Sequence, residues 1–227
     1  MLDRIIRNIT LLVVIAVVMT IAAIGIVSAF EPTADAAFIT ARQLYGLTAF
    51  GVLLGACLIG PVTAVFPRMP LRRILLAGRR SIGVSAYIIA VPHVVCYVWP
   101  MLSQGWRDVF NHGTLWVIGL ALGLLALSDL SVLAWTSRDA SVTSLGGQRW
   151  KQLHRTVYAS VAVVLLHSVL VGADFGFATK PKDEADYGSL VVFSTLTFVW
   201  LVLFWLRRRG MRWPDRSCAH VKPVGGP

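Results

Sequence analysis

Six long apolar stretches, separated by short polar segments, dominate the pattern of hydrophobic and polar positions along the chain. Each has close to the roughly 20 apolar residues that an α-helix needs to cross a bilayer core of about 30 Å. The predicted spans cover approximately residues 9–30, 44–66, 81–102, 114–135, 153–172 and 188–206. The pattern therefore predicts an all-α membrane protein, folded as a six-transmembrane-helix bundle.

The first apolar stretch has two interpretations. It follows a basic start at Arg4 and Arg7 and ends near the small residues Ser28 and Ala29, as a secretory signal peptide would. Its apolar run is longer than the roughly 7–15 residues typical of a signal peptide, so we expect a retained helix. We expect residues 1–210 to form one membrane domain and residues 211–227, which are rich in Pro and Gly, to form a loose cytoplasmic tail.

Composition and charge support a membrane location. Hydrophobic residues make up 56% of the chain and charged residues 14%, against roughly 25% charged residues in soluble domains. The net charge of +10 does not indicate nucleic-acid binding, because the basic residues gather in short loops between the apolar stretches. Three segments hold most of them: residues 67–80, residues 136–155 and the stretch after residue 206. The positive-inside rule places these segments, and both termini, in the cytoplasm, which predicts a multi-pass membrane protein surrounded by lipid.

Three histidines lie in two of the apolar stretches, and a histidine facing hydrocarbon is a functional hypothesis by default. His93 lies in the third predicted span, and His154 and His167 lie in the fifth. Both spans run outward, so their depths can be compared. At about 1.5 Å per residue, His93 lies about 18 Å and His167 about 21 Å above the inner ends of their spans. The two could therefore ligate one iron from opposite sides.

His154 lies close to the inner surface, 13 residues before His167. This separation of about 20 Å suits two stacked hemes better than one, but the two imidazoles fall about 140° from sharing one helix face. Either the fifth span is distorted or the two histidines serve different sites. The alternative for each of the three histidines is a structural hydrogen bond to a carbonyl of a neighbouring helix.

Heme suits these residues better than a bare metal ion. Zinc needs three or four protein ligands close together, whereas heme iron needs one or two axial ligands and an apolar slot. The cysteines Cys57, Cys96 and Cys218 show no metal-binding spacing. Asp129 is the one carboxylate within a predicted span; it could orient a histidine, pair with an arginine or lie at the interface.

Heme also carries two propionates, which favour cationic partners at the membrane edge. Four arginines near the inner ends of the third and fifth spans are candidates for this role, with the setting of topology as the alternative. They are Arg79, Arg80, Arg149 and Arg155.

Two blocks of residues resemble a known family, the MsrQ/YedZ heme-binding membrane proteins. The first runs from Arg79 to Tyr87 and continues with Pro92, His93 and Tyr97. The second comprises Thr136-Ser137, Leu145-Gly146, Trp150, Leu153-His154-Arg155, Val157-Tyr158 and Leu166-His167. The wider group is the ferric-reductase-like transmembrane domain, and the resemblance covers roughly residues 44–206.

The resemblance implies a six-helix domain that binds b-type heme, one or alternatively two, with FMN as a further cofactor of some members. His93, His154 and His167 match the histidine positions of the family. It also implies an electron-transfer subunit of a two-component system in the bacterial inner membrane, with a quinol or a cytosolic flavin reductase as donor. The acceptor would be a periplasmic molybdenum enzyme that reduces methionine sulfoxide. The alternatives are a ferric or metal reductase with another acceptor, a histidine-lined heme or metal transporter, and a structural anchor for a partner enzyme.

Overall fold

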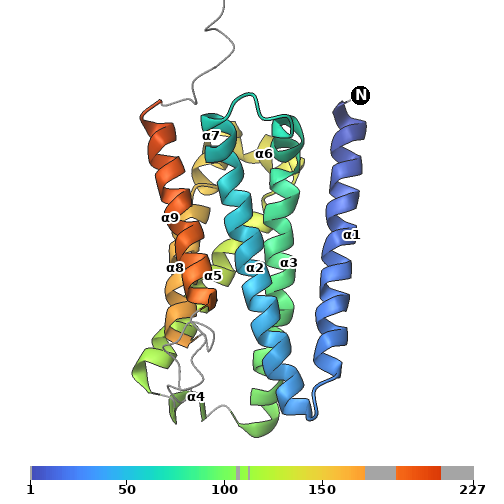
Figure 1. Cartoon of the computed structure of the whole chain (residues 1–227), viewed down its shortest axis with the longest axis vertical. Coiled ribbons are helices and arrows are strands. Elements are labelled where there is room, and N and C mark those ends of the chain that lie inside the picture. The colour runs from blue at the N-terminus through green and yellow to red at the C-terminus, as the bar shows by residue number, and fades with distance from the viewer. Residues whose placement is uncertain (1, 106–107, 112, 172–187, 211–227) are drawn as a thin grey trace, which may run out of the picture.

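The computed structural model describes residues 2–105, 108–111, 113–171 and 188–210, and these residues are helical apart from short turns (Figure 1). The predictions for the tail 211–227 and for Cys218 lie outside the described residues. The helices are α1 (Leu2–Ala29), α2 (Ala34–Val65), α3 (Arg72–Gln104), α4 (Asp108–Asn111), α5 (Thr114–Trp135), α6 (Asp139–Leu145), α7 (Gly147–Leu153), α8 (Val157–Val171) and α9 (Gly188–Arg208).

Six candidate spans are long and apolar enough to cross a membrane, in α1, α2, α3, α5, α7 with α8, and α9. The predicted all-α fold with six spans is therefore confirmed for the described residues. The long helices lie side by side, and the start of α1 and the end of α9 lie at the same end of the bundle (Figure 1). The short helices α6 and α7 lie at that end too, and α4 lies at the opposite end.

The first three helices begin before their predicted apolar segments, α1 at Leu2 instead of residue 9. The second helix begins at Ala34 instead of residue 44, and the third begins at Arg72 instead of residue 81. Thr33 caps α2, because its side chain accepts a hydrogen bond from the Ala36 N–H (3.2 Å). The fifth predicted span is interrupted, since α7 ends at Leu153 and α8 begins at Val157. Of the alternatives left open for the fifth span, the break next to His154 corresponds to a distorted helix.

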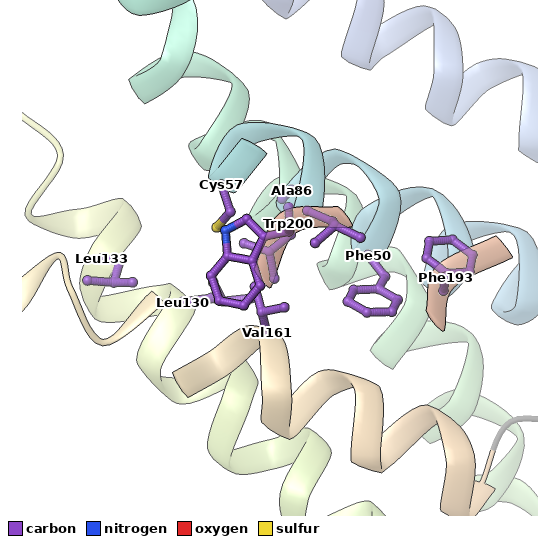
Figure 2. Packing of buried hydrophobic residues seen from close by; sticks show 10 residues of the cluster. Phe50, Cys57, Ala86, Leu130, Leu133, Val161, Phe193 and Trp200 are labelled. Carbon is purple, nitrogen blue, oxygen red and sulfur yellow. The ribbon is translucent and has the colours of Figure 1, made fainter. Parts of the chain in front are cut away.

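A cluster of buried side chains fills the middle of the bundle (Figure 2). Its members come from α2, α3, α5, α8 and α9, so they hold five helices together. The Phe50 and Phe193 rings stack with their centroids 4.8 Å apart, joining α2 to α9. The cluster comprises Phe50, Leu53, Leu54, Cys57, Ala86, Leu130, Leu133, Val161, Phe193 and Trp200.

The first helix packs along α2 and α3 instead of entering this cluster. Val17 and Ile24 are buried with Tyr45 and Ile89 in a second cluster. The Tyr45 hydroxyl donates a hydrogen bond to the Ile21 carbonyl (3.0 Å). Thus α1 forms the outer edge of the bundle, and the other five spans surround its centre (Figure 1).

Truncation of the central cluster should destabilise the fold. Leu54 has no exposed surface, so Leu54→Ala leaves a cavity and should lower the free energy of unfolding by about 2 kcal/mol or more. Leu125 on α5 is 59% exposed, and Leu125→Ala should leave the stability nearly unchanged. Thermal unfolding of the purified protein in detergent compares the two variants. Equal losses of stability would contradict this description of the core.

Candidate functional site

His93 of α3 and His167 of α8 meet in the half of the bundle away from α6 and α7. Their ring centroids are 6.3 Å apart, and the ring planes are nearly perpendicular, at 88°. The match in depth expected for the two residues is therefore present in the structure. Two imidazoles bound to one metal from opposite sides have ring centres about 6 Å apart, because each metal–nitrogen bond takes roughly 2 Å. The observed spacing fits a single metal atom between the two rings.

A main-chain carbonyl of a neighbouring helix fixes each imidazole. His93 Nδ1 lies 2.7 Å from the Arg42 carbonyl oxygen of α2, and His167 Nδ1 lies 2.8 Å from the Gly119 carbonyl oxygen of α5. A carbonyl can only accept, so Nδ1 carries the proton in both rings. The lone pair of each neutral ring is then on Nε2, the nitrogen that can ligate a metal.

Glycine makes both hydrogen bonds possible. Gly46 follows Arg42 by four positions, and Gly123 follows Gly119 by four positions. In a helix the side chain at such a position covers the preceding turn, where the carbonyl lies. A Cβ atom at Gly46 would be 2.8 Å from His93 Nδ1, and one at Gly123 would be 2.7 Å from His167 Nδ1. Neither glycine was predicted as part of the site, although a glycine four positions after a carbonyl partner is a pattern visible in the sequence.

Both histidines line a cavity of about 350 Å³ between α2, α3, α5 and α8. Most of the lining is apolar, and Phe50, Leu53, Ala86 and Leu130 belong both to the lining and to the central cluster. The cluster therefore closes one side of the cavity.

Arg42 also lines this cavity, and its guanidinium carbon lies 5.5 Å from the centre of the Tyr97 ring. Arg42 was not predicted as part of the site. It could have been noticed as a single basic residue at the start of the second apolar stretch, four positions before a glycine.

A bare metal ion is not favoured by these ligands. Among the described residues, no three His, Cys, Asp or Glu side chains come close enough together to hold a metal ion. Two imidazoles suit a metal whose remaining coordination positions are filled by a macrocycle, as in heme.

His154 lies outside the cavity, in the break between α7 and α8. Its ring stacks on Trp150 with the centroids 4.0 Å apart, and its Nε2 lies 3.2 Å from the Thr136 hydroxyl oxygen. That hydroxyl donates its own hydrogen to the Val132 carbonyl (2.7 Å). The oxygen therefore accepts from Nε2, which is the opposite tautomer to that of His93 and His167.

The four arginines proposed for the propionates do not join the histidine pair. Within the described residues, the lining of the cavity includes none of them. Arg80 forms an ion pair with Asp139 and lies over the Trp150 ring. Arg79 donates to the Ala56 carbonyl (3.2 Å) and to the Tyr158 hydroxyl (3.4 Å). Arg149 and Arg155 are exposed.

Among the described residues, the hydrogen bonds of the Asp129 carboxylate go to hydroxyl groups and not to a histidine or an arginine. Its carboxylate accepts from the Thr156 hydroxyl (2.8 Å) and from the Ser160 hydroxyl, which joins α5 to the first turn of α8. Of the three roles expected for Asp129, the structure therefore supports neither the ion pair nor the hydrogen bond to histidine. The hydrogen bonds instead hold α8 in place after the break.

The fold and the site define a class: a multi-pass helical membrane protein with two histidines facing each other across an apolar cavity. The comparisons with known proteins place the chain within that class. A family model for the "Ferric reductase like transmembrane component" matches residues 45–166, just over half of the chain. The protein therefore belongs to the family of ferric reductase-like transmembrane components, as the resemblance of the two residue blocks predicts.

Two kinds of characterised relatives share sequence with the chain. It is 36% identical over 167 residues to the protein-methionine-sulfoxide reductase heme-binding subunit MsrQ of Azospira oryzae, covering 68% of this chain and 65% of that protein. It is 30% identical over 159 residues to MsrQ of Herminiimonas arsenicoxydans, covering 65% of this chain and 64% of that protein. It is also 38% identical over 96 residues to the magnetosome protein MamZ of Paramagnetospirillum magneticum, covering 40% of this chain and 14% of that protein. The chain thus spans less than two thirds of the length of each of these relatives.

Replacing the glycines beside the histidines should reverse the usual effect of alanine. Alanine normally stabilises a helix interior by about 0.5–1 kcal/mol relative to glycine. Gly46→Ala and Gly123→Ala should instead lower the free energy of unfolding by about 1–3 kcal/mol, because the methyl group breaks a buried hydrogen bond. Thermal unfolding in detergent provides the measurement.

The matched control is Gly55→Ala on α2, where a Cβ atom meets nothing within 4 Å. This variant should be as stable as the parent protein or more so. If all three variants shift the unfolding temperature alike, the glycines do not serve the histidines.

Proposed function

We propose that this protein is an inner-membrane electron-transfer subunit that holds a b-type heme between His93 and His167. The main support is the pair of imidazoles, whose ring centroids are 6.3 Å apart and whose Nδ1 atoms each donate a hydrogen bond to a helix carbonyl. This leaves two Nε2 lone pairs for one iron. The description of relatives as heme-binding subunits supports the same assignment.

The residues present fit a heme. Gly46 and Gly123 leave space that a Cβ atom would fill, so the imidazoles are set back against α2 and α5. The cavity between the helices is lined mainly by apolar side chains, as the porphyrin ring requires. The donor set is two neutral imidazoles without a carboxylate or thiolate, which is the chemistry of a six-coordinate heme iron.

Arg42 supplies the positive charge that the carboxylates of a heme require. It is the one cationic side chain among the described lining residues of the cavity, and Tyr97 packs against it. Because the same residue holds His93 through its carbonyl, its position relative to the iron ligand is fixed. Arg42 is thus a stronger candidate than the four inner arginines for the partner of a heme in this cavity.

Heme, when bound, would accept and release one electron without needing a proton from the protein. The chain supplies ligation, orientation and a surrounding of low polarity. Leu53, Ala86 and Leu130 close the cavity toward the centre of the bundle, which keeps water from the ring on that side.

The proposed direction of transfer is from the cytoplasmic side to the periplasm. The end of the bundle that carries α6, α7 and most of the arginines faces the cytoplasm in this proposal. A quinol or a cytosolic flavin reductase is the donor, and a periplasmic methionine sulfoxide reductase is the acceptor, as the name of the MsrQ relatives suggests. A metal reductase with another acceptor is the alternative within the same family.

Two finer assignments stay predictions. A second heme at His154 would need that imidazole to leave its hydrogen bond with Thr136 or to ligate through Nδ1. FMN binding was predicted from the resemblance alone, and the names of the MsrQ relatives mention heme but no flavin.

A visible spectrum of the purified protein tests the heme assignment. Dithionite should induce the α band of a b-type heme, and His93→Ala and His167→Ala should each abolish most of the heme bound in the cavity. The control variant His154→Ala should keep that heme, because His154 does not line the cavity. A spectrum without the α band would exclude heme, and unchanged heme content in both of the first two variants would exclude these ligands.

The charge of Arg42 should raise the midpoint potential of this heme. A nearby positive charge favours the reduced state, so Arg42→Gln should lower the potential by tens of millivolts, while the carbonyl that holds His93 is retained. Arg42→Lys should restore most of the value. Potentiometric titration monitored at the α band is the measurement.

Arg79→Gln is the matched control for this titration, because Arg79 lies outside the cavity lining. If Arg79→Gln shifts the potential and Arg42→Gln does not, an inner arginine is the partner of the heme.

A further inference from the structure

Two arginines from different helices converge on one glycine near the end of the bundle that carries α6 and α7. A Cβ atom at Gly60 of α2 would lie 3.3 Å from Nη1 of Arg79 and 3.4 Å from Nη1 of Arg207. Arg79 comes from α3, and Arg207 is the next-to-last residue of α9. The missing side chain at Gly60 therefore lets two guanidinium groups share one space.

Arg79 is held firmly in this position. Its Nε donates to the Ala56 carbonyl (3.2 Å), and its Nη2 donates to the Tyr158 hydroxyl (3.4 Å). These hydrogen bonds engage Nε and Nη2. The remaining nitrogen, Nη1, lies near Gly60, as does Nη1 of Arg207. Tyr158 is fixed in turn by Trp200 and Phe204, whose ring centroids are each 5.7 Å from its own.

Among the described residues, no carboxylate forms an ion pair with either positive charge. Within the described parts of the chain, neither Arg79 nor Arg207 forms an ion pair, whereas the neighbouring Arg80 is paired with Asp139. Like charges repel each other, so the proximity of Arg79 and Arg207 favours an anion between them. Planar guanidinium groups match the geometry of phosphate oxygens, which they bind through charge-assisted hydrogen bonds.

The depth of the pair fits a phosphate group at the membrane surface. Gly60 lies one to two turns before the end of α2 at Val65, about 8 Å from the end of that helix. Arg207 lies in the last turn of α9. Helix ends at this level of a bilayer meet the headgroup region.

We propose that Arg79 and Arg207, with the Tyr158 hydroxyl, form a binding site for a phosphate group over Gly60. The group belongs either to the headgroup of an anionic phospholipid or to a soluble phosphate compound. The site is separate from the His93 and His167 cavity and does not depend on the proposed function.

Binding to the full-length protein in detergent tests the site. Native mass spectrometry counts the phosphatidylglycerol molecules retained per protein, with phosphatidylcholine as the neutral comparison. Equilibrium dialysis with radiolabelled inorganic phosphate measures the soluble anion. Arg207→Gln should weaken binding of whichever probe binds about tenfold or more, because it removes a guanidinium. Gly60→Ala should weaken it less, because its Cβ atom moves the two flexible guanidinium ends by only a few tenths of an ångström.

Arg209→Gln is the matched control. It removes the same charge two residues further along, where the guanidinium stacks on Trp205 instead. Arg207 is exposed, so its replacement should not disturb folding, and Arg79→Gln adds a second test of the inner guanidinium.

The two probes distinguish the sources. Retention of phosphatidylglycerol that depends on Arg207 identifies a lipid headgroup, and phosphate binding that depends on Arg207 without lipid selectivity identifies a soluble phosphate compound. Binding of neither probe, or equal binding by Arg207→Gln, Gly60→Ala and Arg209→Gln, would overturn the proposal.

Discussion

The site depends on one type of interaction, a hydrogen bond from a histidine Nδ1 to a carbonyl within a neighbouring helix. It occurs twice, between α3 and α2 and between α8 and α5. A helix carbonyl already accepts an intrahelical bond, so its second lone pair can be reached only where no side chain covers it. Gly46 and Gly123 meet this condition, and each thereby fixes a tautomer as well as a position.

This interaction explains why the two helix pairs enclose a cavity and do not close on each other. Each histidine is held back against its partner helix, and the rings are spaced for a metal between them. The central cluster below them sets the length of the cavity, since Phe50, Leu53 and Leu130 serve both as core and as lining. Stability and binding therefore share side chains on one face of the cavity, whereas Arg42 adds charge at its rim without entering the core.

The apolar pattern predicted the number of spans and the shared depth of His93 and His167, because both follow from helix length and rise. It did not predict where α2 and α3 begin, since hydropathy marks the segment in hydrocarbon and not the helix that continues beyond it. The hydrogen-bond partners of individual side chains could not be predicted from this pattern either. Asp129 binds the hydroxyls of Thr156 and Ser160 because the fifth span is broken near them. The position of that break does not follow from the spacing of apolar residues.

The two ends of the bundle present different chemistry around their histidines. At one end, His93 and His167 offer Nε2 to an apolar cavity. At the other, His154 donates from Nε2 to Thr136 and stacks on Trp150, over which lies the ion-paired Arg80. The depth of each histidine follows from the sequence, but which ring nitrogen carries the proton does not. From the sequence alone, all three histidines are therefore candidate ligands. The hydrogen bonds separate them: a carbonyl partner at Nδ1 leaves the ligating nitrogen available, and a hydroxyl partner at Nε2 occupies it.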